Sequence, residues 1–285
     1  MMTEQKTGTR KQEHEIEIDA PIDLVWKAIT EPDQIIRWLC EEASVTPSKG
    51  GHFWVSWGEG QAGDSVIEAW EPGKQLRIRL LGQGGQGDET AKQSPQYNEY
   101  LLESRGNKTV LRLIHSGISA APDWDGYYDG LDRGWQIFLL ALRHYLENHA
   151  GVARDNIVVM RPLATELSEA WRKLTGPEGL GLPEPLTGPE SLAEANSAQT
   201  LPTYKAKSAQ GDSFGGSVCL LMPPKTLLIT IESLNNAMLT ATFEEMGGTT
   251  FFYMSLATFG LGAEKSGEVR ERWANWMDNL LPSAS

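Results

Sequence analysis

His115 is the residue whose type and position best suit chemistry. Leu111, Leu113 and His115 fall on every second residue, so a strand through them places the imidazole on an apolar face at the strand end. An imidazole there can act as a general base or bind a ligand carbonyl. Glu68, in an expected strand over residues 65–70, is the candidate carboxylate partner. A single histidine on an apolar face is more often structural, so both interpretations stay open.

Aromatic residues form the second candidate set. Strand alternation places several of them on the same face as His115, and an expected long helix adds more. They would line a cavity between sheet and helix, because Trp and Tyr combine an apolar ring with one hydrogen-bond donor. The alternative is that they simply fill the core. The predicted ligand-binding residues are Trp38, Phe53, Trp57, Tyr100, His115, Trp135 and Leu139.

Other kinds of site find little support. His144 and His149 are five residues apart, which misses the same-face spacing of a helical metal-ligand pair. The run Gly84-Gly85-Gln86-Gly87 lacks the Lys and Ser/Thr of a phosphate-binding loop, and no Gly-x-Ser-x-Gly elbow occurs. We therefore predict no metal and no cofactor.

Two amphipathic helices must position these residues. In the first, over residues 133–148, Trp135, Leu139, Leu142 and Leu146 lie on one face. The second, near the C-terminus, repeats this spacing and ends before Pro282. Its apolar face holds Val269, Trp273, Met277 and Leu280.

The two halves share further landmarks, which predicts two tandem copies of one domain. Residues 26–32 (Trp-x-x-x-Thr-x-Pro) match 171–177, and 72–76 (Pro-x-Lys-x-Leu) match 223–227. We expect domains over residues 14–151 and 155–285, the second being a divergent copy that serves packing or a partner contact.

Short strands separated by turn residues fill the middle of each half. We expect residues 1–13 to be a disordered lead-in without a secretory signal, and residues 82–95 to be a loop rich in Gly, Gln and Ser. A loop carrying Trp124, Tyr127 and Tyr128 should precede the first long helix, and Gly247-Gly248 should turn a hairpin in the second half. Alternation of apolar and polar residues indicates antiparallel sheets with one covered face.

The first half carries a series of motifs in a definite order: Ala20-Pro21, Val25-Trp26, Ile29-Thr30-Glu31-Pro32, Trp38, Gly50-Gly51-His52-Phe53, Pro72-Gly73-Lys74-Gln75-Leu76, and Gly134-Trp135 with Leu139 and Leu142. Their order and spacing resemble the START-like helix-grip superfamily (SRPBCC). Within it, residues 14–150 look most like homologues of the C-terminal domain of the activator of Hsp90 ATPase. The resemblance implies an α+β fold with two Bet v-like domains, in which a curved antiparallel sheet grips a long C-terminal helix over a cavity. Such cavities hold lipids, sterols or polyketides, and some members are enzymes.

Composition limits the partners. The 285 residues carry a net charge of −13 and show no basic run, which argues against nucleic acid and anionic membranes as partners. No apolar stretch approaches the ~20 residues of a membrane span. Cys40 and Cys219 lie far apart, as expected of reduced thiols in a cytoplasmic protein.

Three functions are consistent with these patterns. The first is non-catalytic binding of a small apolar or aromatic molecule in the first domain, with a role in a stress response. The second is a polyketide cyclase-like enzyme that uses His115, and the third is a chaperone-associated interaction protein.

Overall fold

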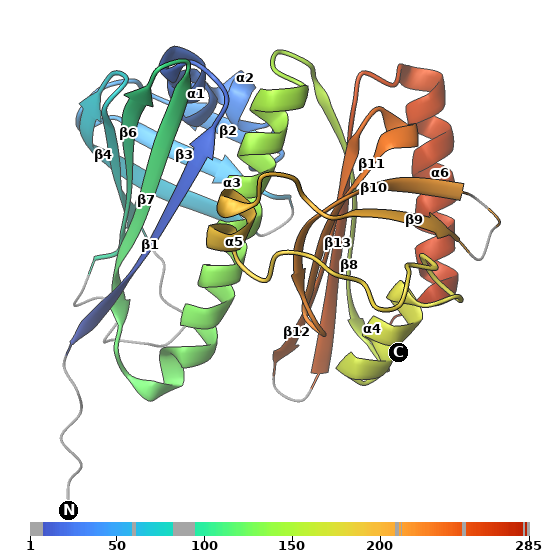
Figure 1. Cartoon of the computed structure of the whole chain (residues 1–285). Coiled ribbons are helices and arrows are strands. Elements are labelled where there is room, and N and C mark those ends of the chain that lie inside the picture. Colours follow the sequence, from blue (N-terminus) through green and yellow to red (C-terminus); the bar gives the residue numbers. More distant parts are fainter. Residues whose placement is uncertain are drawn as a thin grey trace, which may run out of the picture. The chain divides into compact units, whose positions relative to one another are not determined.

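A computed structural model describes residues 8–58, 61–81, 95–208, 211, 213–246, 249–281 and 283. The chain divides into two units, Met1–Gly151 and Val152–Ser285. Each unit contains one antiparallel sheet and ends on a long helix (Figure 1). The first is called unit 1 and the second unit 2.

Unit 1 is built on a seven-stranded sheet with the strand order β1-β7-β6-β5-β4-β3-β2. The first strand pairs with the last, and the others follow as hairpins, so the sheet forms one antiparallel surface. Its elements are β1 (Thr9–Ile18), α1 (Ile22–Thr30), α2 (Pro32–Ile35), β2 (Glu42–Val45), β3 (His52–Ser56), β4 (Ala62–Glu71), β5 (Gln75–Leu81), β6 (Tyr97–Arg105), β7 (Lys108–Ser119), η1 (Pro122–Trp124) and α3 (Asp125–Asn148).

Local sequence explains where these elements begin and end. Pro21 precedes α1, and Pro32 ends it because a proline disfavours helical geometry in the residue before it. Gly73 and Gly106 turn the β4–β5 and β6–β7 hairpins at positive φ angles of 70° and 68°, which glycine adopts without a steric cost. The turns expected from the sequence therefore set the strand order.

Three expectations for unit 1 need correction. The lead-in is shorter than predicted, because β1 begins at Thr9. The long helix begins at Asp125 and not at residue 133, so Tyr127 and Tyr128 are helical. Gly126 and Gly130, which have low helix propensity, interrupt the helical pattern before residue 133 and hid this start. The second short helix ends at Ile35, earlier than the expected Leu39.

Unit 2 repeats the plan with one strand fewer, in the order β8-β13-β12-β11-β10-β9. Again the first strand pairs with the last, and the closing helix follows directly. Its elements are β8 (Arg154–Leu163), α4 (Leu167–Thr175), α5 (Leu192–Ser197), β9 (Thr203–Lys207), β10 (Ser213–Met222), β11 (Thr226–Ile231), η2 (Glu232–Leu234), β12 (Ala237–Met246), β13 (Thr249–Phe259) and α6 (Ala263–Leu280).

The core of each unit lies between the sheet and its closing helix. In unit 1 the buried residues of α3 begin at Trp135 and include Leu139, Leu142 and Leu146, as the helical spacing predicts. In unit 2, Met277 of α6 packs in one apolar cluster with the inner face of the sheet. The Gly247-Gly248 turn and the loop at 82–95, apart from Pro95, lie outside the described residues.

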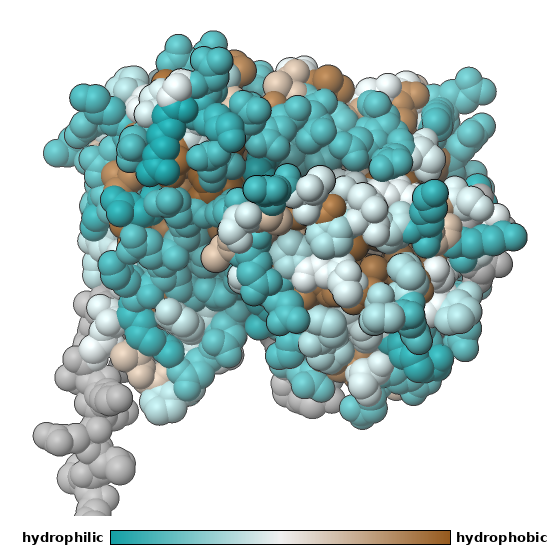
Figure 2. Space-filling model, in the orientation of Figure 1, coloured by the Kyte–Doolittle hydropathy of each residue, from teal (hydrophilic) through white to brown (hydrophobic). Residues whose placement is uncertain are grey.

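The face shown in Figure 2 is mostly polar, with apolar residues in small patches. Within the described part of the chain, no helix is long and apolar enough to cross a membrane.

Candidate functional site

Three polar side chains lie side by side on the inner face of the unit 1 sheet. Strand pairing sets Gln12 of β1 opposite His115 of β7, and His115 opposite Asn98 of β6. All three are buried, with exposed fractions of 3%, 2% and 7%. We call Gln12, His115 and Asn98 the polar row. Because burying polar groups costs free energy unless they are hydrogen-bonded, each of them needs a partner.

Both nitrogens of His115 are engaged. The indole Nε1–H of Trp135 donates to His115 Nδ1 at 3.0 Å, so the ring proton lies on Nε2, which donates to Gln96 Oε1 at 2.9 Å. Burial, together with a smaller effect of the nearby His14, lowers the pKa of His115 to about 4. His115 is therefore a neutral, fixed hydrogen-bonding group and has no free lone pair with which to act as a base.

The other two members of the row are incompletely satisfied. Gln12 Nε2 donates to the backbone carbonyl of Tyr128 at 2.6 Å. Gln12 Oε1 and Asn98 Oδ1, however, have no hydrogen-bond partner among the described residues. Buried acceptors left unpaired cost about 1–3 kcal/mol each. A bound donor, from a ligand or from water, would remove that cost.

Aromatic rings adjoin the row. Trp135 of α3 contacts Tyr100 of β6 edge-on at 6.3 Å between ring centroids, and it contacts Phe138 at 6.1 Å. Phe138 in turn stacks with Trp57 at 6.2 Å. Burial raises the pKa of Tyr100, so its hydroxyl stays protonated. The site thus combines aromatic surface with neutral hydrogen-bonding groups.

The structure places the remaining predicted residues in different settings. Trp38 is buried and donates from Nε1 to the carbonyl of Ala28 at 2.8 Å, which fixes it against α1. Phe53 and Leu139 are buried in the core. Among the described residues, no side-chain hydrogen bond and no ring contact joins Trp38, Phe53 or Leu139 to the polar row. Trp57 is partly exposed and donates to the carbonyl of Leu39 at 2.7 Å.

Glu68 does not meet His115 in any described contact. Its carboxylate forms ion pairs with Arg77 at 3.5 Å and Arg79 at 3.2 Å, and about a third of its side chain is exposed. Those arginines alternate with the buried Ile78, so Glu68 lies on the wet face of the sheet.

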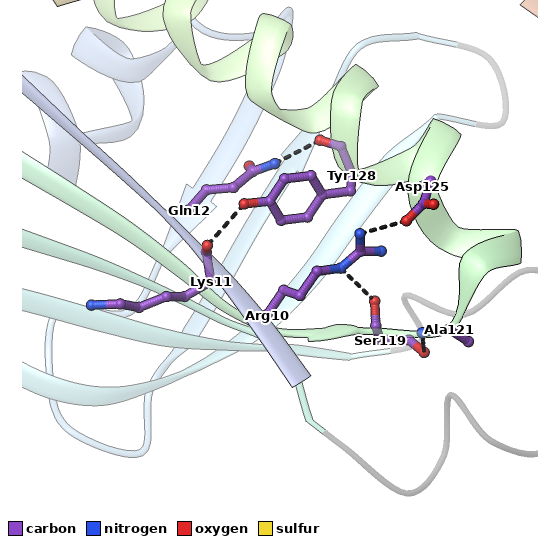
Figure 3. A network of polar contacts seen from close by, with 7 residues as sticks. All are labelled: Arg10, Lys11, Gln12, Ser119, Ala121, Asp125 and Tyr128. Atoms are coloured by element: carbon purple, nitrogen blue, oxygen red, sulfur yellow. Dashed lines mark hydrogen bonds and ion pairs between the residues drawn. The ribbon is translucent and has the colours of Figure 1, made fainter. Parts of the chain in front are cut away.

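A polar network holds the first turns of α3 against β1 (Figure 3). Arg10 forms an ion pair with Asp125 at 2.6 Å and donates to the carbonyl of Ser119 at 3.0 Å. Its guanidinium also lies 4.5 Å from the ring centroid of Tyr128, whose hydroxyl donates to the carbonyl of Lys11 at 3.0 Å. Together with the Gln12–Tyr128 bond, these contacts fix the helix beside the polar row.

His144 and His149 are buried with ring centroids 5.1 Å apart. No group of three or more His, Cys, Asp or Glu side chains within the described ranges is arranged to hold a metal ion.

Sequence reasoning missed Gln12, Gln96 and Asn98. Asn98 precedes Tyr100 by two residues and therefore shares its face, a signal that was available. Gln12 is in phase with Ile16 and Ile18, but the expected lead-in over residues 1–13 removed it from the strand. Gln96 has the same phase as Asn98 and Tyr100 but precedes β6, next to the expected loop over residues 82–95.

A curved antiparallel sheet, two short helices after its first strand and a closing helix packed on its inner face define the helix-grip architecture of START-like proteins. The predicted fold class is confirmed for both units. Residues 19–147 match the family described as "Activator of Hsp90 ATPase homolog 1-like protein". This match confirms, for unit 1, the resemblance predicted from the order of the motifs.

Solved structures give further similarities. The chain is similar to MLL2253 of Mesorhizobium loti, with 28% sequence identity and a TM-score of 0.44. The aligned region covers 49% of this chain and 98% of the MLL2253 chain. The Aha1 dimer of Colwellia psychrerythraea is 22% identical and covers 50% of this chain and 99% of its own (TM-score 0.43). BexL, a di-domain ARO/CYC of the BE-7585A biosynthetic pathway, is 12% identical and covers 97% of this chain and 100% of its own (TM-score 0.44). The curated proteins contain no match.

Proposed function

We propose that unit 1 binds a small, mainly aromatic molecule that carries an O–H or N–H donor, and that it does so without catalysis. The observation that carries this proposal is the pair of buried, unpaired acceptors in the polar row, Gln12 Oε1 and Asn98 Oδ1. Both belong to side chains on the inner face of the sheet, in one row with His115. A ligand donor would pair with one of them.

The state of His115 favours binding over catalysis. General-base chemistry needs an accessible lone pair and a pKa near the working pH. His115 accepts from Trp135, donates to Gln96 and has a pKa lowered to about 4 by burial. The carboxylate of Glu68 forms ion pairs with Arg77 and Arg79. The cyclase-like alternative would require both residues to give up these contacts.

Native mass spectrometry of the full chain, purified from its own host, is the first test. A co-purified small molecule with an aromatic body and a donor group supports the proposal. Cys40 and Cys219 are buried and form no disulfide, which suits a cytoplasmic setting. The preparation should therefore come from the soluble fraction under reducing conditions.

A matched ligand pair tests the donor requirement. Calorimetry with 2-naphthol and 2-methoxynaphthalene compares two bodies of similar shape, of which only the first donates a hydrogen bond. We expect 2-naphthol to bind about fivefold more tightly, since one neutral hydrogen bond contributes about 1 kcal/mol. Asn98→Leu, which has nearly the same shape, should abolish this preference. If water alone satisfies the acceptors, the two compounds bind equally and Asn98→Leu changes nothing.

Interaction with a chaperone is the second candidate, favoured by the family that residues 19–147 match. The same purification tests it. A chaperone that co-elutes with the chain, and still does so with Asn98→Leu, would support this second function, while its absence with a small molecule present would support the first.

A further inference from the structure

Unit 2 contains a cavity of about 250 Å³ beside residues 265–276 of α6. An apolar cavity of about 150 Å³ accommodates benzene, so this one has room for a bicyclic aromatic molecule. Sequence reasoning expected unit 2 to serve packing or a partner contact, and nothing in the sequence indicated an opening here. Its lining residues come from α6, from β10 and β11, from η2 and from the segments after α4 and β9.

The body of the cavity is apolar and aromatic. Trp273 and Trp276 of α6 lie edge to face, with ring centroids 5.2 Å apart, and both line the space. Phe214 of β10 and the buried Ile231 and Val269 complete these walls. Such walls favour a flat aromatic ligand, because offset and edge-on ring contacts add stabilisation to the burial of apolar area.

The rim of the cavity is polar and carries more positive than negative charge. Lys265, Glu268 and Arg272 all line it from α6, one helical turn apart, and all three are exposed. Two cations and one carboxylate leave an excess of one positive charge. The hydroxyls of Ser208, Ser213 and Ser233 also line the cavity and supply further hydrogen-bonding groups.

We propose that this cavity is a second ligand site, specific for a bicyclic aromatic carboxylate. The ring system packs against the tryptophan pair and Phe214, and the carboxylate remains at the rim beside Lys265 and Arg272. An aromatic ligand with a negatively charged tip satisfies both features, whereas a neutral or cationic one satisfies only the first. The site is independent of unit 1, because every lining residue belongs to unit 2.

Calorimetry of the full chain with 2-naphthoate and methyl 2-naphthoate tests the proposal, because the ester is neutral and neither probe carries the hydrogen-bond donor that the proposed unit 1 site requires. We expect 2-naphthoate to bind about fivefold to tenfold more tightly. Trp273→Leu should weaken both probes by at least tenfold. Lys265→Met should weaken only 2-naphthoate, by about fivefold, as expected for one partly exposed ion pair of about 1 kcal/mol.

Lys225→Met is the matched control, because Lys225 is in the β10–β11 turn and does not line the cavity. It should leave both affinities unchanged. Thermal unfolding checks that Trp273→Leu is folded, and Lys265→Met changes an exposed side chain that the fold does not need. Equal binding of the two probes by the unchanged protein would overturn the proposal. So would 2-naphthoate binding that survives Trp273→Leu or that is lost instead with Asn98→Leu in unit 1.

Discussion

Acidification should destabilise unit 1 through His115, and the size of the effect follows from its surroundings. The pKa of His115 is about 4 in the folded protein, against an ordinary value of 6.5, because burial disfavours the charged ring. As the pH falls, the unfolded chain therefore takes up the proton first. Stability is fully present above about pH 6.5 and is lost progressively down to about pH 4. The loss is about 2 kcal/mol at pH 5 and about 3 kcal/mol at pH 4.

The geometry explains why the proton is costly. A protonated imidazole is a donor at both nitrogens, so Nδ1 would then face the indole N–H of Trp135, donor against donor. His115→Gln removes the titration while keeping one donor and one acceptor in place. When the pH falls from 7 to 5, the wild type should therefore lose about 2 kcal/mol more free energy of unfolding than His115→Gln does. The nearby His14, whose pKa burial also lowers, is present in both proteins.

Hydrogen exchange followed by mass spectrometry is the suitable assay, since two units need not unfold in one step. Peptides from β6 and β7 report the opening free energy of unit 1 at each pH. Peptides from β12 and β13 serve as the internal control, because unit 2 contains no histidine. A stability difference between wild type and His115→Gln that stays constant from pH 7 to pH 4.5 would refute the reasoning.

Three further outcomes are expected. Arg10→Ala should speed hydrogen exchange in the first turns of α3 about fivefold at low salt and less at high salt, because the ion pair between Arg10 and Asp125 is partly exposed. Arg112→Ala, which removes the ion pair with Glu13, should leave exchange in α3 unchanged. Gly117→Ala should cost more than about 2 kcal/mol in urea unfolding, since its φ is +86° and an added Cβ would lie 2.2 Å from the Pro95 carbonyl oxygen. Gly130→Ala, in α3 with open space around it, should instead raise stability by up to about 1 kcal/mol, and a loss there would contradict the helical assignment.

Periodicity predicted the fold because each signal lay within a few residues. The apolar step of α3 from Trp135 onward and the Gly73 turn specify a helix and a hairpin without help from distant parts of the chain. The start of α3 was missed because Gly126 and Gly130 lower helix propensity, and contacts with β1 outweigh that local preference.

The candidate site was less predictable, because its chemistry depends on pairings across the chain. Alternation put His115 on the inner face, but its tautomer follows from Gln96 and Trp135, which are 19 and 20 residues away. Alternation also gave no sign that Glu68 would form ion pairs with Arg77 and Arg79 of the neighbouring strand β5. The cavity in unit 2 is harder still, because it is a gap between side chains of several elements.

The two units share one architecture and differ in the polarity of equivalent rows. The fourth residue of the first strand is Gln12 in unit 1 and Ile157 in unit 2, and each pairs with the last strand. In unit 2 the row continues through Leu256 and Leu239, so its three members are fully apolar and buried.

The sheet of unit 2 therefore offers no side-chain polar group where unit 1 offers three. Polar recognition in unit 2 has to come from the rim, where Lys265 and Arg272 lie, and this favours a ligand with an apolar body and a charged end. In unit 1 the polar groups lie on the inner face of the sheet. A ligand there should carry a neutral hydrogen-bond donor, because burying a charge has a large desolvation cost. The two proposed sites are therefore opposite in design, and a single ligand should not satisfy both.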